Sequence, residues 1–598
     1  MYVNRFIHTQ SFKMDTLQVA APYFPANGYS FTYDIRRGFH HLDVALPFRT
    51  YLGFSFQIKG VTFYARFTVC PFGLAPVPWL FTKIMKVLVS YWRDLGMIHF
   101  LYIDDGLGLN ASQEGCAADA QKVRSDLRRL GFFEQPEKCS WSPSQKAKWL
   151  GFLIDLCNFS LTIPTEKLLR AKNALQKALS KNSISCRTLL RVGGLLTSLA
   201  IVYGTVIFLI SKPLYICCQT QLDTGLGYDA QFPITNTLRQ HLQACLQSIT
   251  NLPPYKNLDL SYPTMLCFSD ASDSGGSAVI HRLTPDQTVH SALPVFGLQL
   301  IRQARYAKPV FCDDQVLEPP FSLAYLSKLV SDIDSLCLAD VWPHVNQTAI
   351  VQWDTATRTA SSTHRELAAF LHGIQSLANQ LANNTILWCT DNQAVETILY
   401  KGSSKSPVLH SMALQIFSLT RQHQINLMPL WVPRALNQTA DALSRISDFD
   451  DWSISPLLFK FLNGRWGPHT VDRFSSETTN HLPRFYSRFN CPGAEGVDSF
   501  LFSWTNENNW AVPPPRLIAR VVQHCRLSRA VVTLVIPYWP SSPFWPLFFS
   551  HSQPKPIISD FLVFTNAARF ICPGPQPHSI FHPDRFHGSL VALRLNFS

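Results

Sequence analysis

The run Tyr102-Ile103-Asp104-Asp105 constrains this chain more than any other feature of its sequence. It lies between two apolar, strand-like segments, residues 97–101 and 106–109. Adjacent carboxylates at such a turn, beside an apolar core, must be solvated, paired with a cation or bound to metal. An isolated Asp-Asp pair is more simply explained as a polar hairpin turn, because Asp is a preferred turn residue. Here a further acid upstream favours a divalent cation.

The upstream acid is Asp34, which ends the strand-like run 30–35. At these residues the chain resembles the palm of reverse transcriptases, whose nucleotide transfer uses two magnesium ions about 4 Å apart. Carboxylates on rigid strands suit such hard cations, which prefer oxygen ligands. The resemblance implies two Mg²⁺ in the site, with Mn²⁺ as a possible substitute. It implies Asp34, Ile35 and Asp104 as metal-binding residues, and Asp105 as a further catalytic acid.

The first motif of that family also carries an aromatic gate after its Asp. The matching residue here is Phe39. In the family this residue stacks under the incoming sugar and excludes a 2′ hydroxyl. A bulky gate therefore implies a preference for deoxynucleotides.

Three further segments resemble palm motifs. Residues 70–76 and the helix expected at 78–85 resemble the loop that positions template and nucleotide, with Phe72 and Gly73 at its centre. Gly permits close backbone approach, and the prolines fix the loop before the helix. Lys138 matches a lysine near the triphosphate, although taken alone it fits a solvated surface residue. Leu150 and Gly151 match the turn that grips the primer end. The motifs follow the family's order within about 120 residues, which makes the joint signal strong.

The start of the sequence matches a point already inside the fingers of such enzymes. Residues 2–6 resemble that point, and the family's upstream strands with basic residues that hold the triphosphate are not expected before it. This pattern favours either a reading frame that begins at an internal Met or a truncated gene. It motivates an alternative function, a catalytically dead or domesticated nucleic-acid-binding protein.

Downstream, four acids form a second candidate metal site. Asp270 ends the apolar run 266–270, Asp391 follows residues 387–390, and Asp441 lies in the run 437–445. Glu366 heads a stretch, residues 367–378, whose apolar residues recur at helical spacing. Each acid alone is better explained as an exposed or capping residue, because Asp and Glu are mostly on protein surfaces. Four in one pattern predict a metal site if they converge.

The second set resembles ribonuclease H, which uses two metals to hydrolyse RNA paired to DNA. The resemblance implies Asp270, Glu366, Asp391 and Asp441 as catalytic and metal-binding acids. It places Asn437 near a residue that helps the product leave. The spacing between the first two acids is longer than usual, and the material around residues 308–320 is interpreted as an insertion and a candidate surface flap.

The tail after residue 452 alternates strand-like runs with Pro-rich turns, which predicts a compact α/β module. Residues 390–392, 431–434, 440–445 and 450–452 look most like tyrosine-recombinase retrotransposons of the DIRS and Ngaro kind. Some tails of these elements are methyltransferase-like, with an acid-Pro-Pro-aromatic loop. Residues 511–515 here read Ala-Val-Pro-Pro-Pro and lack the Asp or Asn that would bind an adenine amino group. A non-catalytic module is therefore favoured over methylation.

Leucines recur at helical spacing from about 161 to 211, with Lys and Arg between them, where a polymerase has its thumb. The expected fold class is α/β multidomain, with a reverse-transcriptase palm and truncated fingers, a thumb, a ribonuclease H-like α/β domain and a C-terminal α/β module. The expected boundaries are 1–158 for partial fingers and palm, 159–255 for thumb and connection, 256–448 for the nuclease with its insertion, and 449–598 for the tail.

Composition agrees with these assignments. The chain has 598 residues. A single hydrophobic core stops growing at roughly 300 residues, so the chain is expected to fold into several domains. Its net charge of +12 favours a polyanionic partner and salt-sensitive binding. No run approaches the roughly 20 apolar residues of a membrane span. Fifteen scattered cysteines without ligand spacing and the lack of a signal peptide predict an intracellular protein, in the cytoplasm or nucleus.

The leading hypothesis is a retrotransposon RNA-directed DNA polymerase with ribonuclease H activity. Its expected partners are an RNA template, a DNA primer, the RNA–DNA hybrid and deoxynucleoside triphosphates. Nuclease activity alone is a third hypothesis, because the second site owes nothing to the fingers.

Overall fold

A computed structural model describes residues 2–294, 323–339, 347–446, 451–573, 579–582 and 584–598. The chain divides into two compact units. One comprises Met1–Ser261 with Ala292–Leu323, and the other Tyr262–Ser291 with Ala324–Ser598. The material predicted as an insertion around 308–320 lies outside the described residues, as does Asp450.

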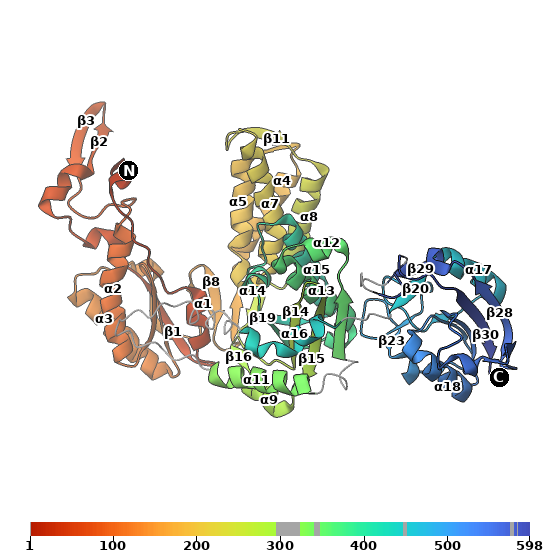
Figure 1. Ribbon diagram of the computed structural model, residues 1–598. Helices are drawn as coiled ribbons and strands as arrows, with labels where there is room; N and C mark the ends of the chain where they lie inside the picture. Colours follow the sequence, from red (N-terminus) through yellow and green to blue (C-terminus); the bar gives the residue numbers. More distant parts are fainter. Residues whose placement is uncertain (1, 295–322, 340–346, 447–450, 574–578, 583) are drawn as a thin grey trace. The chain divides into compact units, whose positions relative to one another are not determined.

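A four-stranded antiparallel sheet in the order β4-β5-β1-β6 forms the palm. Its strands are β1 (Tyr29–Asp34), β4 (Ile98–Tyr102), β5 (Asp105–Asn110) and β6 (Ser140–Ser144). Helices α2 (Val77–Asp94) and α3 (Gln113–Arg129) pack on one face, as Figure 1 shows. The strand alternation explains this arrangement, because Leu101 joins the core under α2 and α3 whereas Phe100 joins a second core. The sheet therefore has an apolar layer on each face.

Two hairpins accompany the palm. The first, β2 (Gly53–Ile58) with β3 (Val61–Arg66), is exposed along almost its whole length. The second begins a sheet ordered β12-β9-β8-β7, made of β7 (Lys146–Trp149), β8 (Phe152–Asp155), β9 (Ser160–Thr162) and β12 (Tyr255–Asn257). Shorter elements of the same unit are η1 (Tyr2–Phe6), α1 (Leu17–Ala20), η2 (Ala21–Tyr23), η3 (Gly38–His41), η4 (Leu46–Leu52), η5 (Pro136–Lys138), β13 (Leu260–Ser261) and β16 (Leu293–Pro294).

The helices predicted between about 161 and 211 are confirmed, and they continue further along the chain. The bundle contains α4 (Thr165–Leu179), α5 (Cys186–Thr197), α6 (Ala200–Tyr203), α7 (Val206–Asp223) and α8 (Asn236–Asn251). The short pair β10 (Ser183–Ser185) and β11 (Gln231–Pro233) interrupts it. Pro213 lies inside α7. Among the described residues, every helix is too short or too polar to span a bilayer.

The second unit contains a five-stranded sheet in the order β17-β15-β14-β18-β19. Strands β14 (Met265–Ala271), β18 (Thr385–Thr390) and β19 (Asn426–Trp431) are parallel, while β15 (Gly275–Arg282) and β17 (Thr348–Gln352) are antiparallel to their neighbours. The helices are α9 (Pro285–His290), α11 (Leu323–Ala339), α12 (Thr355–Thr359), α13 (Ser362–Leu381), α14 (Gln393–Lys401), α15 (Pro407–Gln422), η7 (Arg434–Leu436) and α16 (Gln438–Ser444).

Helix α13 lies close against this sheet. Gly373 permits the approach, since a Cβ at that position would come within 2.5 Å of the Cβ of Ala278 on β15. Phe370 of α13 stacks on Trp388 of β18 with ring centroids 4.2 Å apart. The helix begins at Ser362, four residues before Glu366, because the side chain of Ser361 caps it. Glu366 therefore lies in the second turn rather than at the head of the helix.

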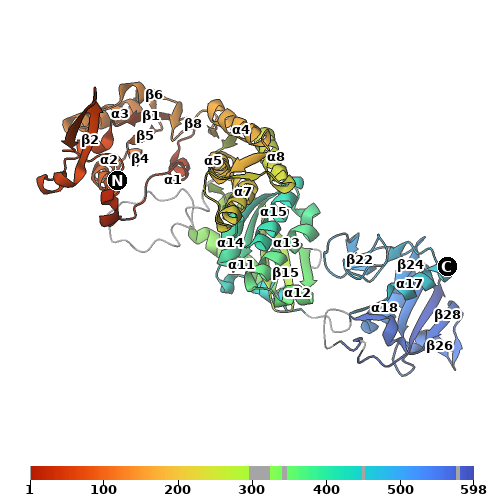
Figure 2. The same ribbon diagram turned by 90° about the horizontal axis from the view of Figure 1, so that it is seen from above.

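The tail is an α/β module, as predicted. Its sheet has the order β21-β24-β25-β30-β28, with the first three strands parallel and β30 antiparallel to both neighbours. Figure 2 shows α17 and α18 beside it. The main elements are β20 (Trp452–Ile454), α17 (Pro456–Trp466), β21 (Val471–Asp472), β24 (Asn508–Ala511), α18 (Ile518–Ser528), β25 (Val531–Pro537), β28 (Ile558–Phe564), β29 (Ile571–Pro573) and β30 (Leu590–Asn596).

Its short elements are β22 (Tyr486–Ser487), β23 (Gly496–Val497), η8 (Ser499–Leu501), η9 (Pro515–Leu517), η10 (Trp545–Leu547), β26 (Phe549–Ser550), β27 (Gln553–Pro554) and η11 (Ala567–Phe570). The cysteines within the described ranges are all free thiols.

Candidate active sites

The three acids of the first unit gather at one end of the palm sheet. Asp34 is the last residue of β1 and is paired with Asp105, the first residue of β5. The backbone N–H of Ile35 donates to the carbonyl oxygen of Asp104 at 2.9 Å. Strand pairing therefore places Asp34 beside Asp105 and near Asp104, although the carboxylate oxygens of these three acids do not all lie within 4.8 Å of one another.

The turn itself is strained. Tyr102 pairs with Asp105, so Ile103 and Asp104 are the two residues at its tip. Ile103 has a φ of 56°, in the left-handed region that a β-branched residue rarely adopts. Such strain is typical of positions where the surrounding structure fixes a functional backbone.

Lys138 lies directly at the acids. Its Nζ donates to Oδ2 of Asp34 at 3.0 Å, although the lysine side chain is 61% exposed. This hydrogen bond raises the pKa of Lys138, and the charges of Asp34, Asp104 and Asp105 add to the effect. The ammonium group of Lys138 thus neutralises part of the negative charge of these acids, which indicates that the site favours a cation.

The two acids of the turn differ in their surroundings. Burial raises the pKa of Asp104, and the charge of Asp34 adds to it. Burial and the charge of Asp34 raise the pKa of Asp105 to about 7, although the backbone N–H of Leu150 donates to its carboxylate. The indole Nε1 of Trp149 also donates to the carbonyl oxygen of Asp105 at 3.2 Å. Asp105 therefore links the palm to the hairpin that carries the expected primer turn.

Leu150 and Gly151 form the two-residue turn of that hairpin. Leu150 and Gly151 both have positive φ, 47° and 74°, between the paired residues Trp149 and Phe152. Two positive φ values in a two-residue hairpin match the right-handed twist of its strands. The turn projects backbone groups beside Asp105.

The aromatic gate and the nucleotide loop are also neighbours. The ring of Phe39 lies 5.1 Å from that of Phe72 and 5.6 Å from that of Phe81 on α2. Gly73 has a φ of 85°, and its carbonyl oxygen accepts a 2.8 Å hydrogen bond from the side chain of Asn4. Sequence reasoning missed Asn4, because nothing local marks a contact 69 residues away.

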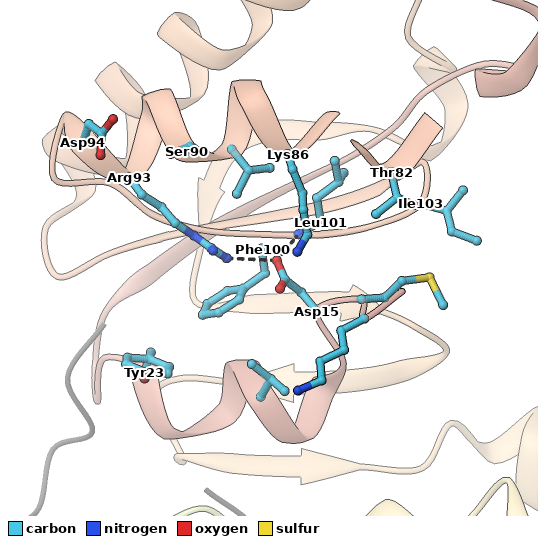
Figure 3. Close-up of a pocket in the computed structure, with 14 residues that line it drawn as sticks. Asp15, Tyr23, Thr82, Lys86, Ser90, Arg93, Asp94, Phe100, Leu101 and Ile103 are labelled. Carbon is cyan, nitrogen blue, oxygen red and sulfur yellow. Dashed lines mark hydrogen bonds and ion pairs between the residues drawn. The ribbon is translucent and has the colours of Figure 1, made fainter. Parts of the chain in front are cut away.

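A pocket of about 250 Å³ lies beside the same turn and includes Ile103 in its lining. Figure 3 shows Asp15 and Arg93 pointing toward one another across it. Asp15 accepts from Arg93 at 2.9 Å and from the backbone N–H of Leu101 at 3.1 Å. The pair thereby ties β4, the strand before the turn, to the segment that precedes the palm sheet. The sequence pattern gave no sign of Asp15.

In the second unit, three of the four predicted acids converge. Asp270 lies at the end of β14, Asp391 directly follows β18, and Glu366 is on α13. One ligand oxygen from each lies within 4.8 Å of the others, and this is the single such group of three or more within the described ranges. Parallel strands β14 and β18 end at the same edge, which explains the meeting of the two aspartates.

Asp441 lies outside that group. Its Oδ1 accepts from Arg445 at 2.8 Å and also from Arg434, and both bonds hold the carboxylate. Burial favours its neutral form, but the two arginines outweigh burial and keep the pKa of Asp441 below its usual range. The expectation of four meeting acids is therefore corrected to three, with Asp441 turned toward arginines. Its charge still acts on the pKa values of Asp270 and Asp391.

Like charges and burial make the acid group ready for a cation. Burial raises the pKa of Glu366 to about 9, with Asp270 and Asp391 adding to the shift. Burial raises that of Asp270 to about 6, opposed by the hydrogen bond from Ser444. Oε2 of Glu366 is buried and has no hydrogen-bond partner among the described residues. An all-oxygen donor set with an orphaned carboxylate oxygen fits a hard divalent ion.

The pH dependence of stability follows from these shifts. Because the folded-state pKa of Glu366 lies above its ordinary value of 4.5, its ionisation is costly in the folded chain. The loss of stability is absent below pH 4.5, increases between pH 4.5 and about pH 9, and stays constant above that. We expect the metal-free chain to unfold at a lower temperature at pH 9 than at pH 6, and Mg²⁺ to reverse the loss. Calorimetry of the second unit's transition, with and without a chelator, checks this. A transition that rises with pH contradicts it.

Asn437, the residue predicted to assist product release, is buried against strand β14. Asn437 is completely buried, and its Nδ2 donates to the carbonyl oxygen of Ser269 at 3.0 Å. The indole of Trp388 donates to Oγ of the same serine at 2.9 Å. Asn437 therefore supports strand β14 next to Asp270, and the predicted role in product release is not supported.

Comparison with known families matches one segment in each of the two compact units. Residues 5–154 match the family described as reverse transcriptase (RNA-dependent DNA polymerase), and residues 345–447 match the family described as reverse transcriptase-like. A search of the curated proteins gave no match. The two matched segments contain the palm acids and three of the four nuclease acids.

Solved structures that match this chain include foamy viral protease-reverse transcriptases. One, in complex with double-stranded DNA, is 14% identical over 72% of this chain and 61% of its own, with a TM-score of 0.37. A second, also with double-stranded DNA, is 13% identical over 72% and 73%, with a TM-score of 0.37. A third, with an RNA/DNA hybrid, is 14% identical over 74% and 70%, with a TM-score of 0.34. The chain spans less than two thirds of the first of these structures.

The chain therefore contains a reverse transcriptase domain and a ribonuclease H-like domain in an α/β multidomain arrangement. These are the domains of RNA-directed DNA polymerases and of ribonuclease H enzymes.

Proposed function

We propose that this protein copies RNA into DNA and then removes the RNA strand from the resulting hybrid. The observation that carries the proposal is that one chain brings together acids at two separate sheet edges, one in each matched domain. The order is chemically sensible, because copying RNA leaves a hybrid whose RNA must be removed before second-strand synthesis. The net charge of +12 suits such polyanionic substrates.

At the palm, Asp34 and Asp104 are the residues that would hold Mg²⁺. When bound, the ions supply activation of the primer 3′ hydroxyl and neutralisation of the triphosphate. The chain's own residues do the rest. Lys138, now paired with Asp34, is positioned to move to the triphosphate, while the turn at Leu150 and Gly151 holds the primer end beside Asp105.

In the nuclease, Asp270, Glu366 and Asp391 would hold the ions, which supply an activated water for attack on an RNA phosphodiester. Arg434 lies at the rim, where its side chain is 65% exposed and reaches Asp441. We propose that it turns toward the backbone of the substrate when the hybrid binds. Its planar, bidentate donor set suits a phosphate.

The gate assignment gives a specific prediction. Phe39 lies against Phe72 and Phe81, so its replacement by a smaller residue leaves a gap where the sugar is expected. We expect Phe39→Val to raise ribonucleotide incorporation relative to deoxynucleotides by about tenfold or more. Primer extension with each nucleotide type measures the ratio. Tyr64→Val, at an 86% exposed aromatic residue in the same unit, should leave it unchanged. If Phe39→Val incorporates ribonucleotides and deoxynucleotides in the same ratio as wild type, Phe39 is not the gate.

We further propose that the chain derives from a retrotransposon, most like the DIRS and Ngaro kind, with a non-catalytic tail. The segment at the position of the methyltransferase-like loop, which would bind the adenine, is enclosed: residues 511–514 are buried. The indole of Trp452 donates to the carbonyl oxygen of Pro513 at 3.1 Å. A buried loop without an acid offers no place for an adenine amino group.

One coupled reaction tests the proposed function. The chain is mixed with an RNA template labelled at its 5′ end, a DNA primer, the four deoxynucleoside triphosphates and Mg²⁺. We expect the primer to lengthen and the labelled RNA then to shorten, and chelation of Mg²⁺ to stop both. Binding of the hybrid without lengthening or shortening would instead identify an inactive nucleic-acid-binding protein. Shortening alone would identify a nuclease.

A further inference from the structure

The stretch between the first two nuclease acids contains a helix that is part of the core. Helix α11 (Leu323–Ala339) has buried apolar side chains at helical spacing, Leu326, Leu329, Val330, Ile333 and Cys337. A surface flap would expose such residues. The described part of this stretch, residues 323–339, is therefore an integral helix.

One acid on this helix faces inward. Asp334 is only 3% exposed. Its Oδ2 accepts from the backbone N–H of Gln438 at 2.9 Å, and its Oδ1 accepts from that of Thr439 at 3.0 Å. The hydroxyl of Thr439 also donates to the carbonyl oxygen of Asp334 at 2.8 Å. Gln438 and Thr439 are the first two residues of α16, the helix that carries Asp441.

Helix α16 needs this help. The first N–H groups of any helix lack partners within it, and a negative charge there complements the helix dipole. The residue before α16, Asn437, provides no side-chain cap: its Nδ2 donates to the carbonyl oxygen of Ser269, and its Oδ1 accepts no hydrogen bond from the described residues. With only seven residues, α16 is also too short to be stable by itself. Asp334 thus supplies from another helix the cap that the local sequence lacks.

The far end of α16 contacts the acid group. Ser444 is completely buried, and its hydroxyl lies 2.9 Å from Oδ2 of Asp270 and 2.9 Å from the carbonyl oxygen of Asp441. A hydroxyl has one proton, and the carboxylate is the stronger acceptor. The position of α16 therefore sets both the orientation of Asp270 and the place of Asp441.

We propose that Asp334 is a positioning residue of the nuclease, which holds α16 in register so that Ser444 keeps Asp270 oriented toward the metal ions. The inference rests on the proposed nuclease function and assigns the inserted helix a part in it. Asp334 touches neither substrate nor the acids, and it acts through α16.

The test compares Asp334→Asn with Asp332→Asn in the full chain. Asp332 is on the same helix but exposed, so its variant makes the same chemical change without touching α16. In Asp334→Asn an amide N–H faces helix N–H groups, so we expect backbone amides 438–444 to exchange hydrogen about tenfold faster or more. Partners of metal-binding residues typically change metal affinity by about 10- to 100-fold. The Mg²⁺ concentration that protects residues 265–271 from exchange should therefore rise by about tenfold.

In kinetics, kcat for hybrid cleavage should fall while KM for the hybrid and primer extension stay unchanged. Asp332→Asn should match wild type throughout, and Asp334→Glu should recover part of the loss. Unchanged exchange at 438–444, or unchanged Mg²⁺ protection, would overturn the proposal. Equal loss of protection across the whole second unit would also overturn it, since that indicates a purely structural role. If wild type cleaves no hybrid, the proposed function fails separately, and the exchange measurements still decide the role of Asp334.

Discussion

Replacing Asp104 by Asn is expected to abolish DNA synthesis, with a fall of about a thousandfold or more in the rate of primer extension. The change keeps the size of the side chain but removes a charge at the tip of the strained turn, where Asp34 and Asp104 are proposed to hold the ions together. Such a fall corresponds to about 4 kcal/mol of lost transition-state stabilisation. Single-nucleotide extension on an RNA template measures it.

The same variant carries its own control, because hybrid cleavage depends on the other unit and should be unchanged. Asp94→Asn is the matched control in the palm, since Asp94 is an exposed acid on the same unit. It should extend primers normally. Magnesium-dependent extension that survives Asp104→Asn would show that the acids of the turn are not the polymerase site.

Replacing Glu366 by Gln is expected to have two opposite effects. Hybrid cleavage should fall by about a thousandfold or more, because the acid group loses one of the three carboxylates proposed to hold the ions. At pH 8 without metal, however, the variant should be more stable than wild type, since it lacks a buried carboxylate whose ionisation is unfavourable. We expect its unfolding temperature to rise by about 4 °C or more, because 1 kcal/mol corresponds to roughly 2–4 °C in a domain of about 150–250 residues.

The control for this variant is Glu396→Gln. Glu396 is a buried acid in the same unit, 1% exposed, but it lies outside the group of three. Its variant should retain cleavage. A Glu366→Gln variant that is inactive and also less stable at pH 8 than wild type would contradict the electrostatic account, because loss of folding would then explain the inactivity.

The sequence predicted the parts of these sites that depend on strands. Asp34, Asp270 and Asp391 lie at strand ends, where an apolar run followed by an acid is visible without a structure. Strand pairing then places Asp34 beside Asp105 in the palm, and Asp270 near Asp391 in the nuclease. The turn at Ile103 was likewise visible, because it lies between two apolar runs, whereas the turn at Leu150 was expected from its resemblance to a palm motif.

The parts that sequence reasoning missed depend on long-range contacts. Asp441 was grouped with the other acids by its order in the chain, but two arginines decide where its carboxylate points. Asn4, Asp334 and Ser444 act through hydrogen bonds to residues 69 or more positions away. No local pattern marks such residues, because Asn, Asp and Ser are also the ordinary residues of turns and surfaces.

The central claim is that each unit holds divalent ions between its acids. The most direct measurement is a crystal structure of the full chain with an RNA–DNA hybrid and Mn²⁺, whose anomalous scattering locates the ions. The account predicts peaks between Asp34 and Asp104 and among Asp270, Glu366 and Asp391, with Lys138 displaced from Asp34. Mn²⁺ bound at neither place, while the hybrid is in contact with both units, would contradict it.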